Sequence, residues 1–224
     1  MNNVEYFFRK DFEKQINIKM LRYDYEFPCE KILDYVNMIN SINISEILNY
    51  ISSDIFISES IESSDIFQFS NLDDAIIKIC EIFKAANDPG LRYFEIGNLL
   101  LNDGLERKKG AFIKYGENHA KTAELLSLLH NINNTYFLSC IGYIFCDLDK
   151  EQQTKLLTRL VLRNKLIIRL LRASKNGKVN VREFLYMISD STYIRRRSNI
   201  KSILNLLTRS DEYDFSNFIN NLRF

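Results

Sequence analysis

The stretch 190-DSTYIRRRSNIKSILNLL-207 combines a helical spacing of apolar residues with three consecutive arginines near its start. One face of the helical wheel holds a tyrosine and four aliphatic residues: Tyr193, Ile200, Ile203, Leu204 and Leu207. This spacing predicts a long amphipathic helix that packs on a core. Arg195, Arg196 and Arg197 repel one another, and positive charge is unfavourable near the positive end of the helix dipole. An anionic partner would offset that cost, and a solvated charge cluster is the simpler alternative.

The composition is that of a globular, mainly helical protein. Of the 224 residues, 46% are hydrophobic and 26% are charged, and the chain has only 7 Gly and 2 Pro. Because Gly and Pro punctuate strand-rich folds, their scarcity favours helices with a few short strands. The length allows one large domain or two to three small ones.

The cysteines and histidines are too sparse to predict a metal site. Cys29, Cys80, Cys140 and Cys146 form no CxxC motif, and the only histidines are His119 and His130. We interpret the cysteines as small buried apolar residues, and free thiols favour a reducing compartment. The N-terminal segment lacks the apolar core of a signal peptide, and the longest apolar run, 136–145, is too short to span a membrane. We therefore expect a cytoplasmic protein without membrane contact.

Charge is distributed unevenly along the chain. Residues 1–100 carry 9 basic and 17 acidic side chains, whereas residues 101–210 carry 20 basic and 9 acidic ones. Such a contrast between halves indicates a polyanion-binding segment, although charge also fluctuates along ordinary chains.

Hydrophobic periodicity and turn residues divide the chain into short elements. Helices are predicted over 30–42, 45–53, 73–87, 93–101, 118–130, 149–174 (broken near 163–164), 182–189 and the last stretch. Strands are predicted over 136–145 and 178–181, and the closing segment 211–224 as a helix or a strand. The Ser-rich stretch 58–71 is predicted to be a connector.

Two parts of the chain resemble each other. Residues 95–101 align with 183–189, and residues 125–129 align with 203–207, with a longer connector in the first copy. Each copy is predicted to run from a long helix through a short element and a short helix to a second long helix. This is the helix-turn-helix order, and the added strands suggest its winged-helix variant. The predicted fold is therefore mainly α with short β wings: a small N-terminal region (1–70) followed by winged-helix-like modules at 71–147 and 148–224.

In the second copy, the face opposite the apolar stripe is suited to DNA. Arginine pairs with guanine, asparagine with adenine, and serine with bases or phosphates. The candidate base contacts are Arg195, Ser198, Asn199 and Ser202. Arg196, Arg197 and Lys201 are candidate phosphate contacts. A plain amphipathic helix with a solvated face remains the alternative.

In the first copy, the face predicted to point outward is small. His119, Ala120 and Ala123 are candidate base contacts, because small side chains allow a close approach to a groove. The candidate phosphate contacts around them are Arg107, Lys108, Lys109, Lys114 and Lys121. The same small face is equally suited to packing on a neighbouring helix.

The pattern 192-TYIRRRSNIKSILNLL-207 resembles the terminal helix of winged-helix modules in bacterial defence proteins, including restriction endonuclease recognition domains and regions attached to AAA ATPases. The stretch 115-YGENHAKTAELLSLL-129 resembles a companion motif. The resemblance spans about residues 73–207 and departs where those families carry Trp, because aliphatic pairs such as Ile203/Leu204 stand there. It implies DNA recognition as part of a larger system.

Evidence for catalysis is weak. Asp88, Glu106 and Lys108 match the spacing of a metal-dependent nuclease, but a helix is predicted between the acid and the E-x-K motif, which should lie on adjacent strands. The sequence has no P-loop, GxGxxG or GxSxG motif. We therefore expect no enzyme, no cofactor and no metal.

The sequence predicts double-stranded DNA binding, with sequence-specific recognition in a restriction or other defence system and catalysis supplied elsewhere. A transcriptional regulator or plasmid replication initiator is one alternative, and a non-enzymatic winged-helix interaction scaffold is another. The acidic N-terminal region is assigned to dimerisation, or to docking a partner nuclease or ATPase subunit.

Overall fold

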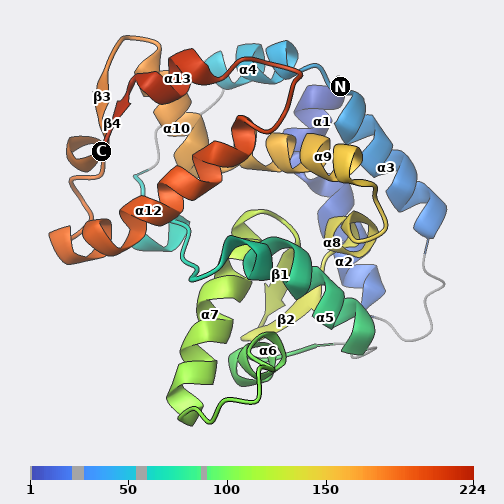
Figure 1. The fold of residues 1–224 in the computed structure, drawn as a ribbon. Coiled ribbons are helices and arrows are strands. Elements are labelled where there is room, and N and C mark those ends of the chain that lie inside the picture. Colours follow the sequence, from blue (N-terminus) through green and yellow to red (C-terminus); the bar gives the residue numbers. More distant parts are fainter. Residues whose placement is uncertain (1, 22–27, 54–59, 87–89) are drawn as a thin grey trace. The chain divides into compact units, whose positions relative to one another are not determined.

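The computed structural model describes residues 2–21, 28–53, 60–86 and 90–224. It confirms a mainly helical protein, with 66% helix and a small two-stranded antiparallel sheet (Figure 1). The chain forms two compact units, and each draws on separate stretches of sequence. Unit 1 comprises residues 1–9, 38–67 and 150–224, and unit 2 comprises residues 10–37 and 68–149.

Unit 1 is built from helices and one very short parallel strand pair. Its elements are α1 (Asn3–Arg9), the end of α3 (Cys29–Ser41), α4 (Ile44–Ser52), α9 (Lys150–Leu162), α10 (Lys165–Ser174), β3 (Val179–Asn180), α11 (Val181–Phe184), α12 (Asp190–Leu207), α13 (Ser216–Asn220) and β4 (Leu222–Arg223). Helix α9 packs on α12, and α4 packs on both α1 and α10. The side chains of Leu160, Ile167, Ile203 and Leu207 are buried in this unit.

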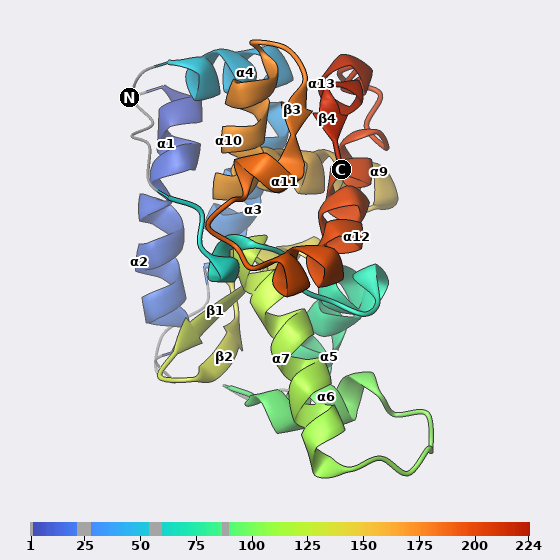
Figure 2. The ribbon, with the colours of Figure 1, turned by 90° about the vertical axis from the view of Figure 1, so that its left-hand side faces the viewer.

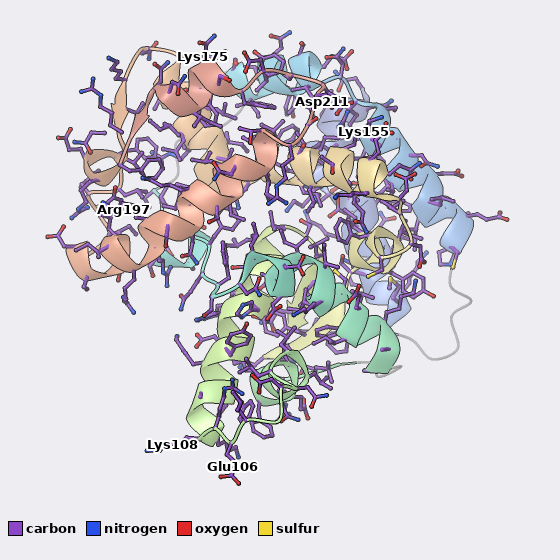
Figure 3. The ribbon with its side chains drawn as sticks, viewed as in Figure 1. Glu106, Lys108, Lys155, Lys175, Arg197 and Asp211 are labelled. Carbon is purple, nitrogen blue, oxygen red and sulfur yellow. The ribbon has the colours of Figure 1, made fainter. Side chains whose placement is uncertain are left out.

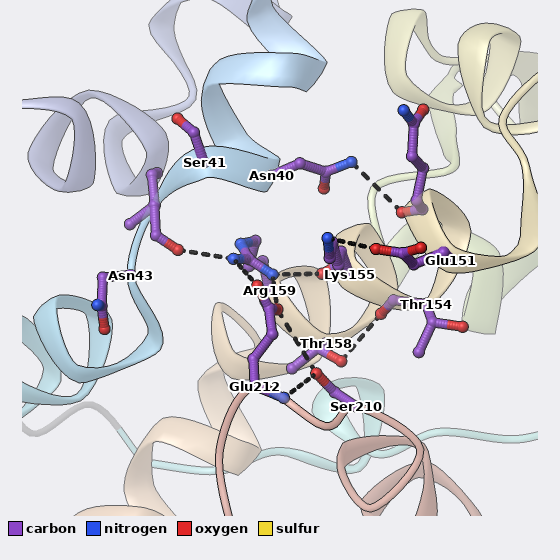
Figure 4. Close-up of polar contacts among 12 residues, drawn as sticks. Asn40, Ser41, Asn43, Glu151, Thr154, Lys155, Thr158, Arg159, Ser210 and Glu212 are labelled. Carbon is purple, nitrogen blue, oxygen red and sulfur yellow. Dashed lines mark hydrogen bonds and ion pairs between the residues drawn. The ribbon is translucent and has the colours of Figure 1, made fainter.

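The side chain of Arg159, on α9, is buried and bridges separate stretches of unit 1 (Figure 4). Its guanidinium forms a two-point pair with the Glu212 carboxylate at 2.6 and 3.0 Å. It also donates to the backbone carbonyls of Ile42, at 2.7 Å, and Lys155, at 3.0 Å. The hydrogen bonds from Arg159 lower the pKa of Glu212. One turn later, Arg163 donates to the carbonyl of Phe7 at 2.9 Å. These two arginines connect α9 to chain segments more than 50 residues away.

Unit 2 combines helices with an antiparallel hairpin. Its elements are α2 (Asp11–Met20), most of α3, a wide helical turn (Asp74–Lys78) leading into α5 (Ile79–Ala86), α6 (Tyr93–Leu100), α7 (Lys109–Leu125), β1 (Leu129–Ile132), β2 (Thr135–Leu138) and α8 (Cys140–Phe145). The hairpin turns at Asn133 and Asn134, which both have positive φ. Asparagine tolerates this conformation better than most residues. Leu91, between α5 and α6, pairs with Tyr136 of β2 in an antiparallel bridge. Figure 2 shows the β1–β2 hairpin of this unit.

Helices α6 and α7 approach each other through two glycines. A Cβ on Gly97 would lie 1.9 Å from the carbonyl oxygen of Phe112, and a Cβ on Gly116 would lie 1.9 Å from that of Tyr93. No side chain fits at either position, so glycine is required for this crossing.

The periodic stretches form the elements that their sequence predicts. Helices α3, α4, α6 and α12 match the predicted ranges, and the break near residue 164 separates α9 from α10, where the Asn164 side chain caps α10. The closing segment contains both a helix, α13, and a strand, β4. The stretch 58–71 has no long helix or strand in its described part, residues 60–71.

Three predicted elements have boundaries that differ from the structure. The strand predicted over 136–145 ends at Leu138, because Ser139 caps a helix by accepting a hydrogen bond from the backbone N–H of Gly142. The helix predicted over 118–130 is wrong at both ends, because α7 begins nine residues earlier, at Lys109, and ends at Leu125, before strand β1. Helix α11 ends at Phe184 rather than at residue 189.

The predicted division at residues 70 and 147 differs in part from the two units. The change between units at Asp149 and Lys150 lies close to the predicted boundary at 147, whereas residues 1–70 are shared between the units. Across residues 2–21, 28–53, 60–86 and 90–224, every helix is too short or too polar to cross a membrane.

The glycine crossing gives a direct stability test. Replacing Gly116 with Ala should lower the free energy of unfolding by about 1–3 kcal/mol, because the new methyl group overlaps the backbone of α6. Gly110→Ala is the matched control on the same helix, since its Cβ meets nothing within 4 Å, and it should be neutral or slightly stabilising. Urea unfolding followed by circular dichroism measures both. Equal effects would contradict the close crossing.

The Arg159–Glu212 pair gives a second test. Glu212→Gln should lower the free energy of unfolding by about 2 kcal/mol, because it leaves a buried guanidinium without its counter-charge. The matched control is Glu151→Gln, which breaks an exposed pair with Lys155 and should cost less than about 0.5 kcal/mol. Thermal unfolding of the three proteins compares them. A Glu212 effect as small as that of the control would show that Arg159 does not need its carboxylate partner.

Candidate nucleic-acid interface

The start of α12 is well capped, which changes the position of the arginine cluster. The Ser189 side chain accepts from the backbone N–H of Thr192, and Asp190 occupies the first turn. Asp190 also pairs with Arg182 at 2.5 Å. Residues 190–192 form the first turn of α12, so the arginines lie in its second turn. The dipole effect falls off after the first turn, so it opposes them less than the sequence suggested.

The apolar face predicted for α12 is confirmed, since Tyr193, Ile200, Ile203, Leu204 and Leu207 are all buried. The opposite face carries exposed or half-buried cationic, small polar and aliphatic side chains: Ser191, Ile194, Arg195, Arg197, Ser198, Lys201, Ser202 and Asn205. Asp190 is the helix's only acidic residue. After its first turn, this face therefore presents positive charge without a carboxylate of its own.

The three arginines have different surroundings. Arg195 is exposed, and among the described residues its guanidinium donates only to its own helix, to the Ser191 carbonyl at 3.1 Å and the Thr192 hydroxyl at 3.3 Å. Arg196 donates to the backbone carbonyls of Ser63 and Ile66, so it holds the segment 60–67 of unit 1. Arg197 is exposed, and its guanidinium makes no hydrogen bond or ion pair to any described residue (Figure 3). The prediction that Arg196 is available for phosphate is therefore not supported by its position.

The other α12 candidates are also divided. Ser198 is exposed, and its hydroxyl donates to the Asn199 side chain at 3.2 Å. Ser202 is half-buried and donates to the carbonyl of Ser198 at 3.0 Å. Asn199 is buried, so its prediction as a base contact is wrong. Lys201 is exposed, with its ammonium 4.9 Å from the centre of the Phe224 ring.

Exposed apolar residues next to this face were missed by the sequence reasoning. Tyr186, Met187 and Ile194 are 75%, 65% and 69% exposed. Tyr186 and Met187 lie in the turn between α11 and α12, which the sequence had placed inside a helix. Beside them is an open cavity of about 440 Å³, lined by residues 60–63, 187–189 and Thr192. In the sequence, Ile194 is an apolar residue on the otherwise polar face of α12, and this is the signal that could have indicated the exposed apolar group.

His119 is a structural residue of unit 2. Its side chain is fully buried, and its Nε2 accepts from the backbone N–H of Asn71 at 3.2 Å. Its Nδ1 therefore carries the proton and donates to the Tyr115 carbonyl at 2.7 Å. Burial lowers the pKa of His119, which keeps the ring neutral. The prediction that His119 contacts a base is wrong, because both nitrogens are occupied inside the protein.

The small face of α7 is also covered. Ala120 and Ala123 are fully buried, so they are not available as base contacts. Thr122 is also buried, and it exchanges hydrogen bonds with the backbone of Gln68. The alternative interpretation, that small residues pack inside the protein, is the correct one for this helix.

Three of the five basic residues around α7 pair with carboxylates. Lys114 and Lys121 both pair with Glu117, at 2.9 and 2.6 Å. Arg107 pairs with Asp103, and Lys109 lies 5.4 Å from the centre of the Phe94 ring. The Lys108 side chain is exposed, and no hydrogen bond or ion pair joins its ammonium to the described residues. Among the described residues, Lys108 and Lys109 thus have no carboxylate partner, compared with three such cations on α12.

The nuclease-like spacing gains no geometric support. Glu106 and Lys108 lie in the exposed loop between α6 and α7, at the tip of that loop in Figure 3, and not on a strand. Asp88 lies outside the described residues. In the described part of the chain, no group of three or more His, Cys, Asp or Glu side chains is arranged to hold a metal ion. Comparisons with protein-family models, curated proteins and solved structures found no match to this chain.

Proposed function

We propose that the protein binds double-stranded DNA through the exposed face of α12. The observation that carries the proposal is the row of exposed cations, Arg195, Arg197 and Lys201, on a helix whose only carboxylate is its N-terminal Asp190. Phosphates are the partners that such a row attracts, and binding them would offset the repulsion between Arg195 and Arg197.

The order of elements supports this proposal. In unit 1, α10, α11 and α12 follow one another with a short strand between the first two, as in a helix-turn-helix. In unit 2, α5, Leu91, α6, α7 and the β1–β2 hairpin follow the order of a winged helix, with Leu91 bridged to the second hairpin strand. Unit 1 differs from the winged-helix order, because its strand β3 pairs in parallel with β4, whereas the corresponding strand of a winged helix pairs with a β-hairpin.

The α12 side chains divide into two proposed roles. Arg195 lies beside Ser198 and Ser202 on the helical wheel. Its guanidinium makes only long hydrogen bonds to its own helix, and it can give these up to pair with a guanine edge. Arg197 and Lys201 are one turn apart at the other side of the same face, where they would bind phosphates. Sequence would then be read by Arg195, and affinity would come mainly from the other two.

The proposed setting is recognition in a restriction or other defence system, in which a partner nuclease or ATPase subunit supplies catalysis. It rests on the resemblance of residues 192–207 to recognition modules of such proteins. Transcriptional control or plasmid replication would use the same DNA-binding face.

A protein-interaction scaffold is the second candidate. The exposure of Tyr186, Met187 and Ile194 beside an open cavity favours it, because clustered exposed apolar side chains mark interaction surfaces. The charged α12 residues therefore favour DNA as the partner, whereas these apolar residues favour another protein. Substituting one group at a time distinguishes the two functions.

Duplex binding measured by fluorescence anisotropy over a range of salt concentrations tests the proposal. Arg197→Ala should weaken binding to all duplexes and reduce the salt slope by about 0.9, the value for one phosphate contact. Arg195→Ala should relax the preference at one base pair in a random-sequence selection, at a cost of about 1–3 kcal/mol on the preferred site.

Arg209→Ala is the charge-matched control, because Arg209 is exposed just beyond the end of α12. It should bind like the parent protein. If Arg209→Ala weakened duplex binding as much as Arg197→Ala, the weaker binding would follow from the change in net charge and not from the position of Arg197. Binding that is insensitive to salt and to both α12 variants, but lost on Met187→Ser, would support the scaffold instead.

A further inference from the structure

Two cysteines of unit 2 meet where α5 packs on α8. Cys80 lies on α5 and is fully buried, whereas Cys146 directly follows α8 and is half-buried. The pairing of Lys84, one turn after Cys80, with Asp147, the residue after Cys146, brings the two cysteines together, although 65 residues separate them in the sequence. Their thiols are close enough for each to change the pKa of the other. Both are reduced in the structure. The expectation that all four cysteines are small buried apolar residues therefore misses this pair, and Cys29 is exposed.

A lysine is fixed beside the more exposed thiol. Lys84 lies one helical turn after Cys80, and its ammonium pairs with the carboxylate of Asp147, the residue after Cys146. The same ammonium lies 4.9 Å from the centre of the Tyr143 ring. Two contacts thus hold a positive charge close to the Cys146 sulfur.

The two thiols differ in acidity. The neighbouring Cys80 thiol lowers the pKa of Cys146, and the charge of Lys84 lowers it further. Burial raises the pKa of Cys80, which stays protonated. This asymmetry matches the pairing of a reactive, accessible thiolate with a resolving thiol.

We propose that Cys146 and Cys80 form a peroxide-reactive dithiol site that closes as a disulfide between α5 and the end of α8. The Cys146 thiolate attacks one peroxide oxygen, an S–O bond forms, and the O–O bond breaks. With hydrogen peroxide, the departing oxygen takes a proton and leaves as water. The Cys80 sulfur then attacks the Cys146 sulfenic acid, the S–S bond forms, and the hydroxyl leaves with the Cys80 proton as a second water. Each sulfur loses one electron, and the peroxide is reduced.

Peptide mapping of the full-length protein after treatment with hydrogen peroxide tests this site. We expect one cross-linked peptide joining Cys80 to Cys146, which dithiothreitol reverses. Cys80→Ser should leave a sulfenic acid on Cys146 that dimedone traps, and Cys146→Ser should leave Cys80 reduced. Cys29 is the control for exposure alone, and it should form no intramolecular disulfide.

Lys84→Met separates the role of charge from that of proximity. It should slow peroxide oxidation several-fold, whereas Lys78→Met, which removes an exposed lysine paired with Asp74 earlier in the same helical stretch, should not. Circular dichroism checks that each variant is folded. Oxidation of Cys29 while Cys80 and Cys146 remain thiols would overturn the proposal, as would a mixture of disulfides among all four cysteines.

Discussion

The buried guanidinium of Arg159 is the contact on which unit 1 depends most. It joins α9 to the carbonyl of Ile42, between α3 and α4, and to the carboxylate of Glu212, after α12. A buried charge that loses a partner costs several kcal/mol, so these segments are stable only when they are assembled together. Residues 38–67 and 150–224 therefore form one unit although 82 residues separate them in the sequence.

This assembly determines which face of α12 is presented to solvent. Helix α9 packs on the apolar side of α12, and the pair with Glu212 fixes the chain that leaves it. Arg196 is used to hold residues 60–67, so two of the three consecutive arginines remain on the surface. The repulsion within the cluster is thus relieved in part by an internal partner. The exposed pair, Arg195 and Arg197, with Lys201, is what we propose DNA binds.

The sequence predicts the elements with strong periodicity and predicts the site only in part. Helices α3, α4 and α12 have clean apolar stripes, and Asn164 marks the break between α9 and α10. The run 136–145 is apolar at nearly every position, so its period does not distinguish the strand from α8. A helical wheel shows which residues share a face, but not whether another segment covers that face. His119, Ala120 and Ala123 were placed outside for that reason, although residues 68–71 and other elements cover them.

Arginine side-chain NMR tests the central claim most directly, because it reports each guanidinium during a titration with duplex DNA. The account predicts that the Nε–Hε signals of Arg195 and Arg197 shift or broaden at substoichiometric duplex and recover when salt is added. The signals of Arg159 and Arg163, both buried in unit 1, should stay unchanged. Unchanged Arg195 and Arg197 signals in the presence of bound duplex would contradict the claim that α12 is the DNA-binding face.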